Sequence, residues 1–177
     1  GFLRYKAVAA LEHLRLDHPT LAIDPAAVEK HVIAEAGRAF NALTLYTNLF
    51  VLGGVDPGSL LARVLEERRR RATDRVFRLL GLVHSSSDIA AVSVALRTTE
   101  GRRRSGALEL LDNMLSGDVR RRVMLLVEDM PAEERVRKGN VIYKTRPRDL
   151  EDTVAQLMHD DNQVVASAAI LLIEERR

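Results

Sequence analysis

The sequence predicts an all-α protein, an irregular stack of helical hairpins around two long central helices. Apolar residues recur at helical spacing from Phe2 to Glu175, and capping residues, Gly and Pro divide that pattern into segments. Aromatic residues make up only 4% of the 177 residues and Trp is absent. The core must therefore be built from Leu, Val, Ala and Ile, as it is in helix stacks. A third observation is a short pattern that occurs three times.

Three segments place a small residue four positions before a large apolar one. Residues four apart lie on one face of a helix, so the small residue lets a neighbouring helix approach and the large one fills the space beyond it. This is typical of the inner helices of stacked hairpins, which bury their apolar faces only against neighbours. We expect the alanines of the second and third pairs to be buried at helix–helix contacts. The pairs are Ala7 with Leu11, Ala107 with Leu111, and Ala168 with Leu172.

The boundaries of the helices follow from their capping residues. Most begin after Ser, Thr or Asp, two of them at Asp-Pro, and Gly53-Gly54 ends the first long one. The helices predicted in the first three quarters of the chain cover 2–16, 26–52 and 59–82, a shorter segment from the serines at 85–87 to 96, then 100–115, and a segment from 116–118 to about 130.

The last quarter of the chain contains an interruption. One or two helical turns are expected over 131–137, followed by a loop over 138–147, because Val141-Ile142-Tyr143 favours a strand that has no partner strand. A helix over 148–158, an acidic turn over 159–161 and a final helix over 162–175 complete the chain. We expect one domain over 1–177, with a long-helix part over 1–83 and hairpins over 84–177.

Two sets of segments resemble known proteins. The stretch from Leu157 to Ala169 places acidic turn residues before a helix rich in small residues, and it resembles the HEAT-repeat signature. The longer set looks like the soluble helical region of bacterial ATP/ADP-translocase-like membrane proteins, which are related to major-facilitator transporters. The segments that carry the second resemblance are Phe2–Ala7, Arg75–Leu82, Asp88-Ile89, Ala95–Arg97 and Arg104–Leu115.

This resemblance implies a HEAT- or armadillo-like stack that follows a transporter-like membrane half. In that family a cyclic-nucleotide-binding-like domain often comes after the repeats. No transport or nucleotide-binding residue can be carried over to this chain, because the matching segments do not include the membrane half.

The sequence contains no constellation of residues typical of catalysis. There is no Cys, and the five His form neither an i,i+4 pair nor an HExxH pattern. Gly53-Gly54 lacks the context of a phosphate-binding loop, and Ser85 to Ser87 lacks that of a nucleophile elbow. We therefore expect a protein that is not an enzyme, with no catalytic residue, no metal and no cofactor.

Arginine clusters are the first candidates for partner binding. The run Arg68 to Arg71 continues with Arg75 and Arg78 on one helix, and carboxylates lie four residues from Arg70, Arg71 and Arg78. This spacing favours a solvated, salt-bridged face; a polyanion footprint is the alternative. The clusters at 102–104 and 120–122 each follow a short turn and open a helix, where backbone amides also attract anions. We predict that both lie on one edge of adjacent helices, unless their long stems merely cover apolar surface.

The predicted loop over 138–147 is the second candidate. It is basic and contains a tyrosine that we expect to be exposed, and it is either a mobile linker or a contact site. The candidate partner-binding residues are Arg102, Arg103, Arg104, Arg120, Arg121, Arg122, Lys138, Tyr143, Lys144 and Arg146.

The expected function follows from the fold and from a net charge of only +2. No apolar run approaches the roughly 18 residues of a membrane span, and no signal peptide is seen. The chain begins inside a helical pattern, so we expect a piece of a larger protein, cytoplasmic and tethered to the inner membrane. We expect a non-catalytic scaffold or docking domain for adjacent domains of that protein or for another protein. Nucleic-acid or polyanion binding by the arginine clusters is the alternative.

Overall fold

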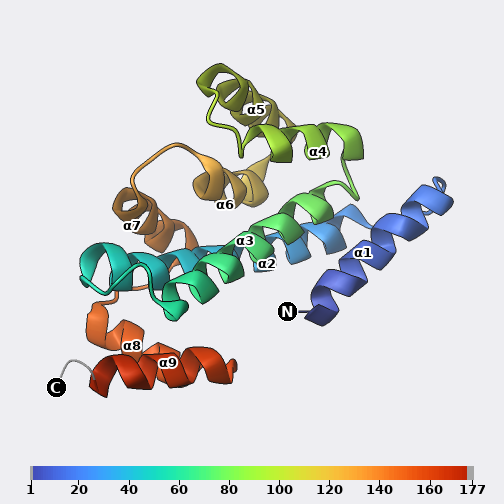
Figure 1. Cartoon of the computed structure of the whole chain (residues 1–177). Coiled ribbons are helices and arrows are strands. Elements are labelled where there is room, and N and C mark those ends of the chain that lie inside the picture. Colours follow the sequence, from blue (N-terminus) through green and yellow to red (C-terminus); the bar gives the residue numbers. More distant parts are fainter. Residues whose placement is uncertain (1, 175–177) are drawn as a thin grey trace. The chain divides into compact units, whose positions relative to one another are not determined.

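The computed structural model describes residues 2–174, and all regular structure within that range is helical (Figure 1). The all-α prediction is confirmed for these residues, whereas the HEAT- or armadillo-like stacking stays a prediction. The elements are α1 (Phe2–Asp17), α2 (Pro25–Tyr46), the π-helix η1 (Thr47–Leu52), α3 (Leu60–Leu80), α4 (Ser86–Ala95), α5 (Gly101–Met114), α6 (Gly117–Val127), α7 (Ala132–Tyr143), α8 (Leu150–Met158) and α9 (Gln163–Glu174).

The chain divides into two compact units. Unit 1 contains the residues up to Arg38 together with Arg71–Asp129, and unit 2 contains Ala39–Arg70 together with the residues from Met130 on. Two of the three division points lie inside the long helices α2 and α3, so each of these helices contributes to both units. This division differs from the expected one near residue 83, because sequence order does not reveal that the two long helices are shared.

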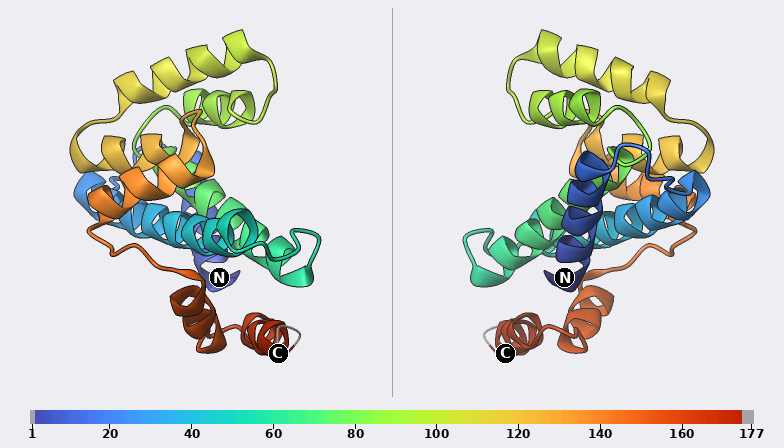
Figure 2. Two further views of the ribbon diagram at one scale, coloured as in Figure 1. Left: turned by 90° about the vertical axis from the view of Figure 1, so that its left-hand side faces the viewer. Right: turned by 90° about the vertical axis from the view of Figure 1, so that its right-hand side faces the viewer.

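Unit 1 contains consecutive hairpins formed by α4, α5 and α6, with α4 and α5 lying side by side (Figure 2). Ala107 and Leu111 on α5 are both buried, as the second small-to-large pair predicts. The prediction of an inner helix from the first pair is wrong, because Ala7 and Leu11 on α1 are both exposed. Helix α1 instead buries Val8, the residue after Ala7, against the rest of unit 1.

The core of unit 2 joins the second half of α2, η1 and the first half of α3 to the α8–α9 hairpin. Leu45, Leu49 and Leu65 are fully buried there beside Leu157 of α8. On α9 the buried positions are shifted by one residue from the predicted pair: Val165 and Ala169 are fully buried, whereas Ala168 and Leu172 are half-buried and pack against this core.

The end of the first long helix is a wider turn than the sequence predicts. The six residues of η1 continue α2 as a π-helix, and its first four side chains are buried. A Cβ on Gly53 would lie 2.6 Å from the carbonyl oxygen of Asn48, so a residue with a side chain would clash with the backbone at this position. Gly54 follows with a φ of 65°, in the left-handed region that glycine adopts without a steric penalty.

The prediction of a loop over 138–147 is wrong for the first six of these residues, because they belong to α7. The helix ends at Lys144, which adopts the left-handed conformation with a φ of 53°. Only the residues from Lys144 to Asp149 connect α7 to α8.

Packing against α2 explains why this segment is helical despite its strand propensity. Gly139 and Tyr143 lie four residues apart on α7 and therefore on one face. The Tyr143 ring stacks on Phe40 of α2 with centroids 4.5 Å apart and planes 5° apart. The Phe40 ring also lies directly over Gly139, whose missing side chain leaves the room for it. Tertiary contact thus outweighs the local preference of the β-branched residues.

Candidate functional site

The first arginine cluster, at the start of α5, is divided between two roles. The Arg104 guanidinium donates hydrogen bonds to the carbonyl oxygens of Leu96, which caps α4, and of Val127, the last residue of α6, the latter at 2.8 Å. These carbonyls have no partner within their own helices, so Arg104 satisfies two helix ends at once. Arg102 and Arg103 are exposed to solvent.

The second cluster, at the start of α6, is paired with carboxylates of the same chain. Arg120 makes two hydrogen bonds to Asp112, at 2.5 and 2.6 Å. Asp118 accepts from Arg121 at 3.0 Å and from Arg122 at 2.7 Å. The hydrogen bonds from Arg120 and Arg122 hold the pKa values of the Asp112 and Asp118 carboxyls below their ordinary range. All three cations therefore have a carboxylate partner in the same chain, with Arg121 and Arg122 sharing Asp118.

The prediction that the two clusters share one edge is wrong. Arg104 reaches the end of α6, whereas Arg120 reaches Asp112 near the end of α5. These contacts show that α5 and α6 run antiparallel. Each cluster opens its own helix, and the starts of consecutive antiparallel helices lie at opposite ends of the hairpin.

Arg104 should matter for folding and its two neighbours should not. We expect Arg104→Met to lower the free energy of unfolding by about 1.5–3 kcal/mol, because charged hydrogen bonds to two helix ends are lost. The matched control Arg103→Met removes an exposed cation and should stay within about 0.5 kcal/mol of the parent. Urea unfolding followed by circular dichroism measures both. Equal stability of the two variants would contradict the capping role.

The basic residues near α7 lie in unit 2, and most of them have partners there. Lys138 Nζ lies 2.9 Å from a Glu134 carboxylate oxygen on the same helix, and Arg146 lies 3.0 Å from Asp152. Tyr143 is half-buried against Phe40, so the expectation of an exposed ring is wrong. Lys144 is exposed at the end of α7.

The arginine run on α3 is not only a solvated face. On its surface Arg70 pairs with Glu67 at 2.7 Å, three residues away, as a salt-bridged helix face does. Arg75, however, is buried in unit 1, where its Nε lies 2.9 Å from a Glu35 carboxylate oxygen. The side chains of Arg75 and Glu35 are only 7% and 5% exposed. This part of the prediction is wrong, because the face of α3 that carries Arg75 packs against α2.

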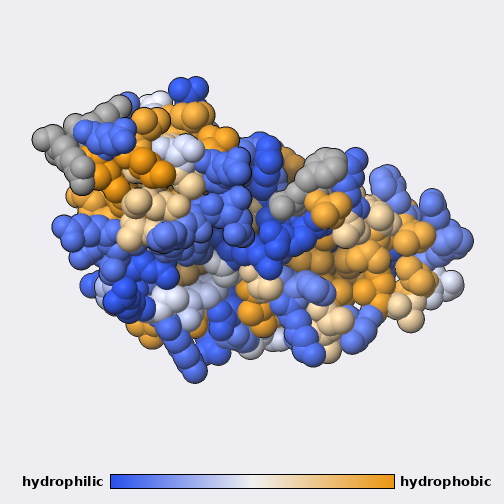
Figure 3. All heavy atoms as spheres, turned by 90° about the horizontal axis from the view of Figure 1, so that it is seen from below, coloured by the Kyte–Doolittle hydropathy of each residue, from blue (hydrophilic) through white to orange (hydrophobic). Residues whose placement is uncertain are grey.

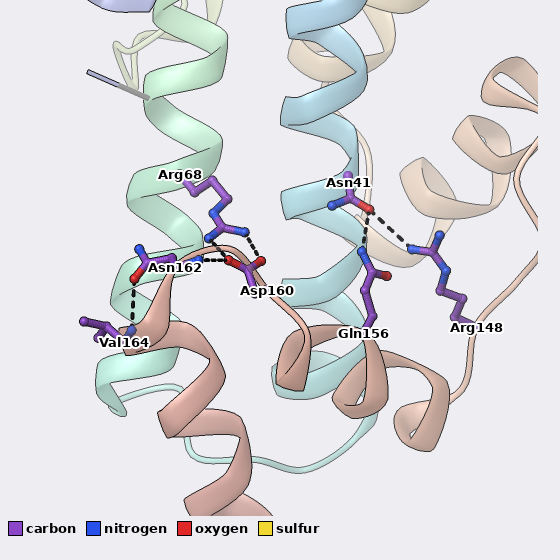
Figure 4. Close-up of polar contacts among 7 residues, drawn as sticks. All are labelled: Asn41, Arg68, Arg148, Gln156, Asp160, Asn162 and Val164. Atoms are coloured by element: carbon purple, nitrogen blue, oxygen red, sulfur yellow. Dashed lines mark hydrogen bonds and ion pairs between the residues drawn. The ribbon is translucent and has the colours of Figure 1, made fainter. Parts of the chain in front are cut away.

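The sequence also misses a polar network that holds the α8–α9 hairpin in unit 2, and Figure 4 shows the part of it around Asn41. Asn41 Oδ1 accepts hydrogen bonds from Arg148 at 3.3 Å and Gln156 at 3.4 Å. Asn48 Nδ2 donates to the Arg148 carbonyl oxygen and to Thr153 Oγ1, each at 3.1 Å. These partners are about a hundred residues apart in the chain, so no local spacing could reveal them.

A two-pronged ion pair fixes the turn between α8 and α9. Arg68 of α3 donates to both carboxylate oxygens of Asp160, at 2.6 and 2.8 Å (Figure 4). Asp160 also accepts from the backbone amide of Asn162 at 2.9 Å, so it caps the acidic turn that the sequence predicts over 159–161. Asp160 thus both caps the turn and attaches the α8–α9 hairpin to α3.

This ion pair gives unit 2 a defined pH dependence. Hydrogen bonds from Arg68 hold the pKa of the Asp160 carboxyl below its ordinary value, against the smaller opposing effect of burial. The stabilisation is therefore complete above the unfolded-state pKa of about 3.9 and is lost as the pH falls through the lower folded-state pKa. In the parent, the free energy of unfolding should therefore fall between about pH 7 and about pH 3. Asp160→Asn should reduce this loss, as urea titrations at the two pH values measure. Asp161→Asn removes a neighbouring carboxylate that makes no hydrogen bond to Arg68, and it should change that loss less than Asp160→Asn does.

Large apolar side chains are exposed on several helices, and the largest groups of them lie on α1 and α9. On α1 these are Leu3, Leu14 and Leu16, which are 81%, 47% and 70% exposed. On α9 they are Val164 and Leu171, which are 51% and 57% exposed. Apolar atoms accordingly gather over α1 and over the region of α9 in the space-filling view (Figure 3).

Comparison with known proteins leaves the resemblance as a prediction: no family model, no curated protein and no solved structure matches this chain. Within residues 2–174, no three or more His, Asp or Glu side chains come together as metal ligands would. None of the helices described above combines the length and the apolar character needed to cross a membrane.

Proposed function

We propose that this chain is a non-catalytic helical docking domain of a translocase-like bacterial membrane protein. It lies on the cytoplasmic side of the inner membrane and contacts an adjoining domain of the same protein. The observation that carries the proposal is the outer face of α9, which remains apolar and exposed although its inner face is already packed.

The two faces of α9 differ in what covers them. Val165 and Ala169, four residues apart, are fully buried in the core of unit 2. Val164 and Leu171, seven residues apart, share another face and are both more than half exposed. In a stack of helical hairpins each apolar face is covered by the next unit. The occupant of this face is therefore the neighbouring helical unit or domain of the parent protein.

The arginine contacts also support docking through apolar surface. Four of the clustered arginines already bond groups of the same chain, so a phosphate would have to compete with those bonds. They are Arg104, Arg120, Arg121 and Arg122.

The proposal is tested on the parent gene and its product. The reading frame that contains the Gly1 codon should encode membrane-spanning helices upstream, and a start codon beside it with no such helices would contradict the proposal. The purified parent protein without this domain should bind the labelled chain. Leu171→Lys should weaken that binding at least about tenfold, as loss of a central apolar contact does. Leu110→Lys is the matched control, since Leu110 is 45% exposed on α5, and it should leave the affinity unchanged.

One observation favours the alternative, a polyanion-binding role. Arg102 and Arg103 are exposed at the start of α5, where helix amides attract anions. Two cations form a small footprint compared with the 6–10 phosphate contacts, roughly, of strong nucleic-acid binders.

A further inference from the structure

We infer that the outer face of α1 is a docking surface for a second copy of this chain, with the two α1 helices packed antiparallel about a two-fold axis. The inference concerns unit 1 and does not rest on the proposed function, which uses α9.

One face of α1 holds the helix against unit 1, mainly through polar contacts. Val8 is buried there, and Arg78 of α3 donates a hydrogen bond to Glu12. The Arg78 guanidinium also lies 5.0 Å from the centre of the Tyr5 ring. These contacts fix which face of α1 points away from unit 1.

The opposite face of α1 is an uncharged apolar stripe. Leu3, Ala7, Ala10 and Leu14 follow one another at spacings of four, three and four residues, which places them in one row along the helix. All four are exposed, and Leu3 is 81% exposed. An apolar row of this kind in water gains free energy when another apolar surface covers it.

The stripe is complementary to itself, and this identifies the occupant. Read in either direction, the row gives Leu, Ala, Ala, Leu with the same spacing. In a two-fold contact, residue i of one copy meets residue j of the other and j meets i. An antiparallel pair therefore places Leu3 against Leu14 and Ala7 against Ala10, twice. The central alanines let the helix axes approach to about 8 Å, and the leucines at both ends close over the contact.

The size of this surface predicts a weak dimer. The 16 residues of α1 form a helix about 24 Å long. One helix face of that length offers less than the roughly 800 Å² per partner of a standard interface, so we expect a dissociation constant on the order of 10–100 µM. The stripe carries no charge, so the affinity should change little with salt.

Sedimentation equilibrium of the full chain tests the inference. We expect a monomer–dimer equilibrium in the range on the order of 10–100 µM, with little change between low and high salt. Leu14→Lys should raise the dissociation constant at least about tenfold, because both copies lose a contact. Leu110→Lys, an equally exposed control on α5, should leave it unchanged. Because Leu14 is 47% exposed, we expect the Leu14→Lys variant to fold. A circular dichroism spectrum like that of the parent chain verifies this.

Disulfide trapping tests the orientation. The chain has no Cys, so an introduced thiol is the only one present. A mixture of Ala7→Cys and Ala10→Cys chains should form mixed disulfides much faster than either variant alone forms its own. A chain that stays monomeric throughout the concentration range would overturn the inference. So would dimers that Leu14→Lys does not weaken, or Ala7→Cys chains that cross-link to one another as fast as the mixture does.

Discussion

Replacing Glu35 by Leu should lower the free energy of unfolding by about 3–5 kcal/mol, the largest effect expected from a single substitution in unit 1. Glu35 is the carboxylate that faces the buried guanidinium of Arg75 at 2.9 Å. Without it, a cation that is 7% exposed stays away from water and without its counter-charge. Urea or thermal unfolding followed by circular dichroism gives the difference.

A double variant separates the unpaired charge from the loss of packing. Glu35→Leu combined with Arg75→Met removes both charges and keeps apolar volume, and such replacements of buried pairs are often close to neutral. We expect the double variant to be more stable than Glu35→Leu alone by at least about 2 kcal/mol. Arg38 also contacts Glu35 at 2.9 Å, but its side chain is 42% exposed, so water can take over its solvation. A single variant within about 1 kcal/mol of the parent would contradict the buried pair.

Gly139→Ala should destabilise unit 2 by about 1–3 kcal/mol through overpacking. The added Cβ would lie 2.0 Å from Cε2 of Phe40 and 2.4 Å from its Cζ. Phe40 is itself buried and stacked on Tyr143, so its ring has little freedom to move aside. Alanine favours a helix by about 0.8–1.0 kcal/mol over glycine, and this gain offsets part of the cost of the clash. Thermal and urea unfolding measure the net effect.

Gly106 provides a matched control on α5. A Cβ at this exposed helical position meets no atom within 4 Å, so Gly106→Ala should stabilise the protein by about 0.8–1.0 kcal/mol. Combining Gly139→Ala with Phe40→Leu should recover part of the loss, since the smaller side chain makes room for the methyl group. If both Gly→Ala variants are stabilising, the close contact between α2 and α7 does not exist.

The parts of the fold that depend on local sequence could be predicted. Ser85 caps α4 by accepting a hydrogen bond from the Asp88 amide, as the serines at 85–87 predict. Asp149 caps α8 in the same way through the Asp152 amide, so this helix begins two residues later than the expected start at 148. Such caps are set by neighbouring residues, so the starts of these helices follow from spacing alone. The helix over 138–143 could not be predicted, because its stability comes from Phe40, about a hundred residues earlier.

The candidate site was predictable only in part for the same reason. The pair of Arg122 with Asp118 spans four residues, and a helical pattern indicates it directly. Arg120 reaches Asp112 across a turn, and Arg68 reaches Asp160 ninety-two residues later. The sequence therefore identifies the arginines, but it does not identify the carboxylates and carbonyl oxygens to which they are bonded in the fold. Apolar exposure on α1 and α9 is likewise visible only once the packed faces are known.

Binding of a fluorescein-labelled DNA duplex of about 20 base pairs, followed by anisotropy in about 150 mM salt, tests the central claim most directly. If the chain docks proteins through apolar faces and uses its clustered arginines internally, the anisotropy should stay at its starting value up to about 100 µM chain. A micromolar dissociation constant that weakens steeply with salt, and that is lost when Arg102 and Arg103 are both changed to Gln, would contradict the account.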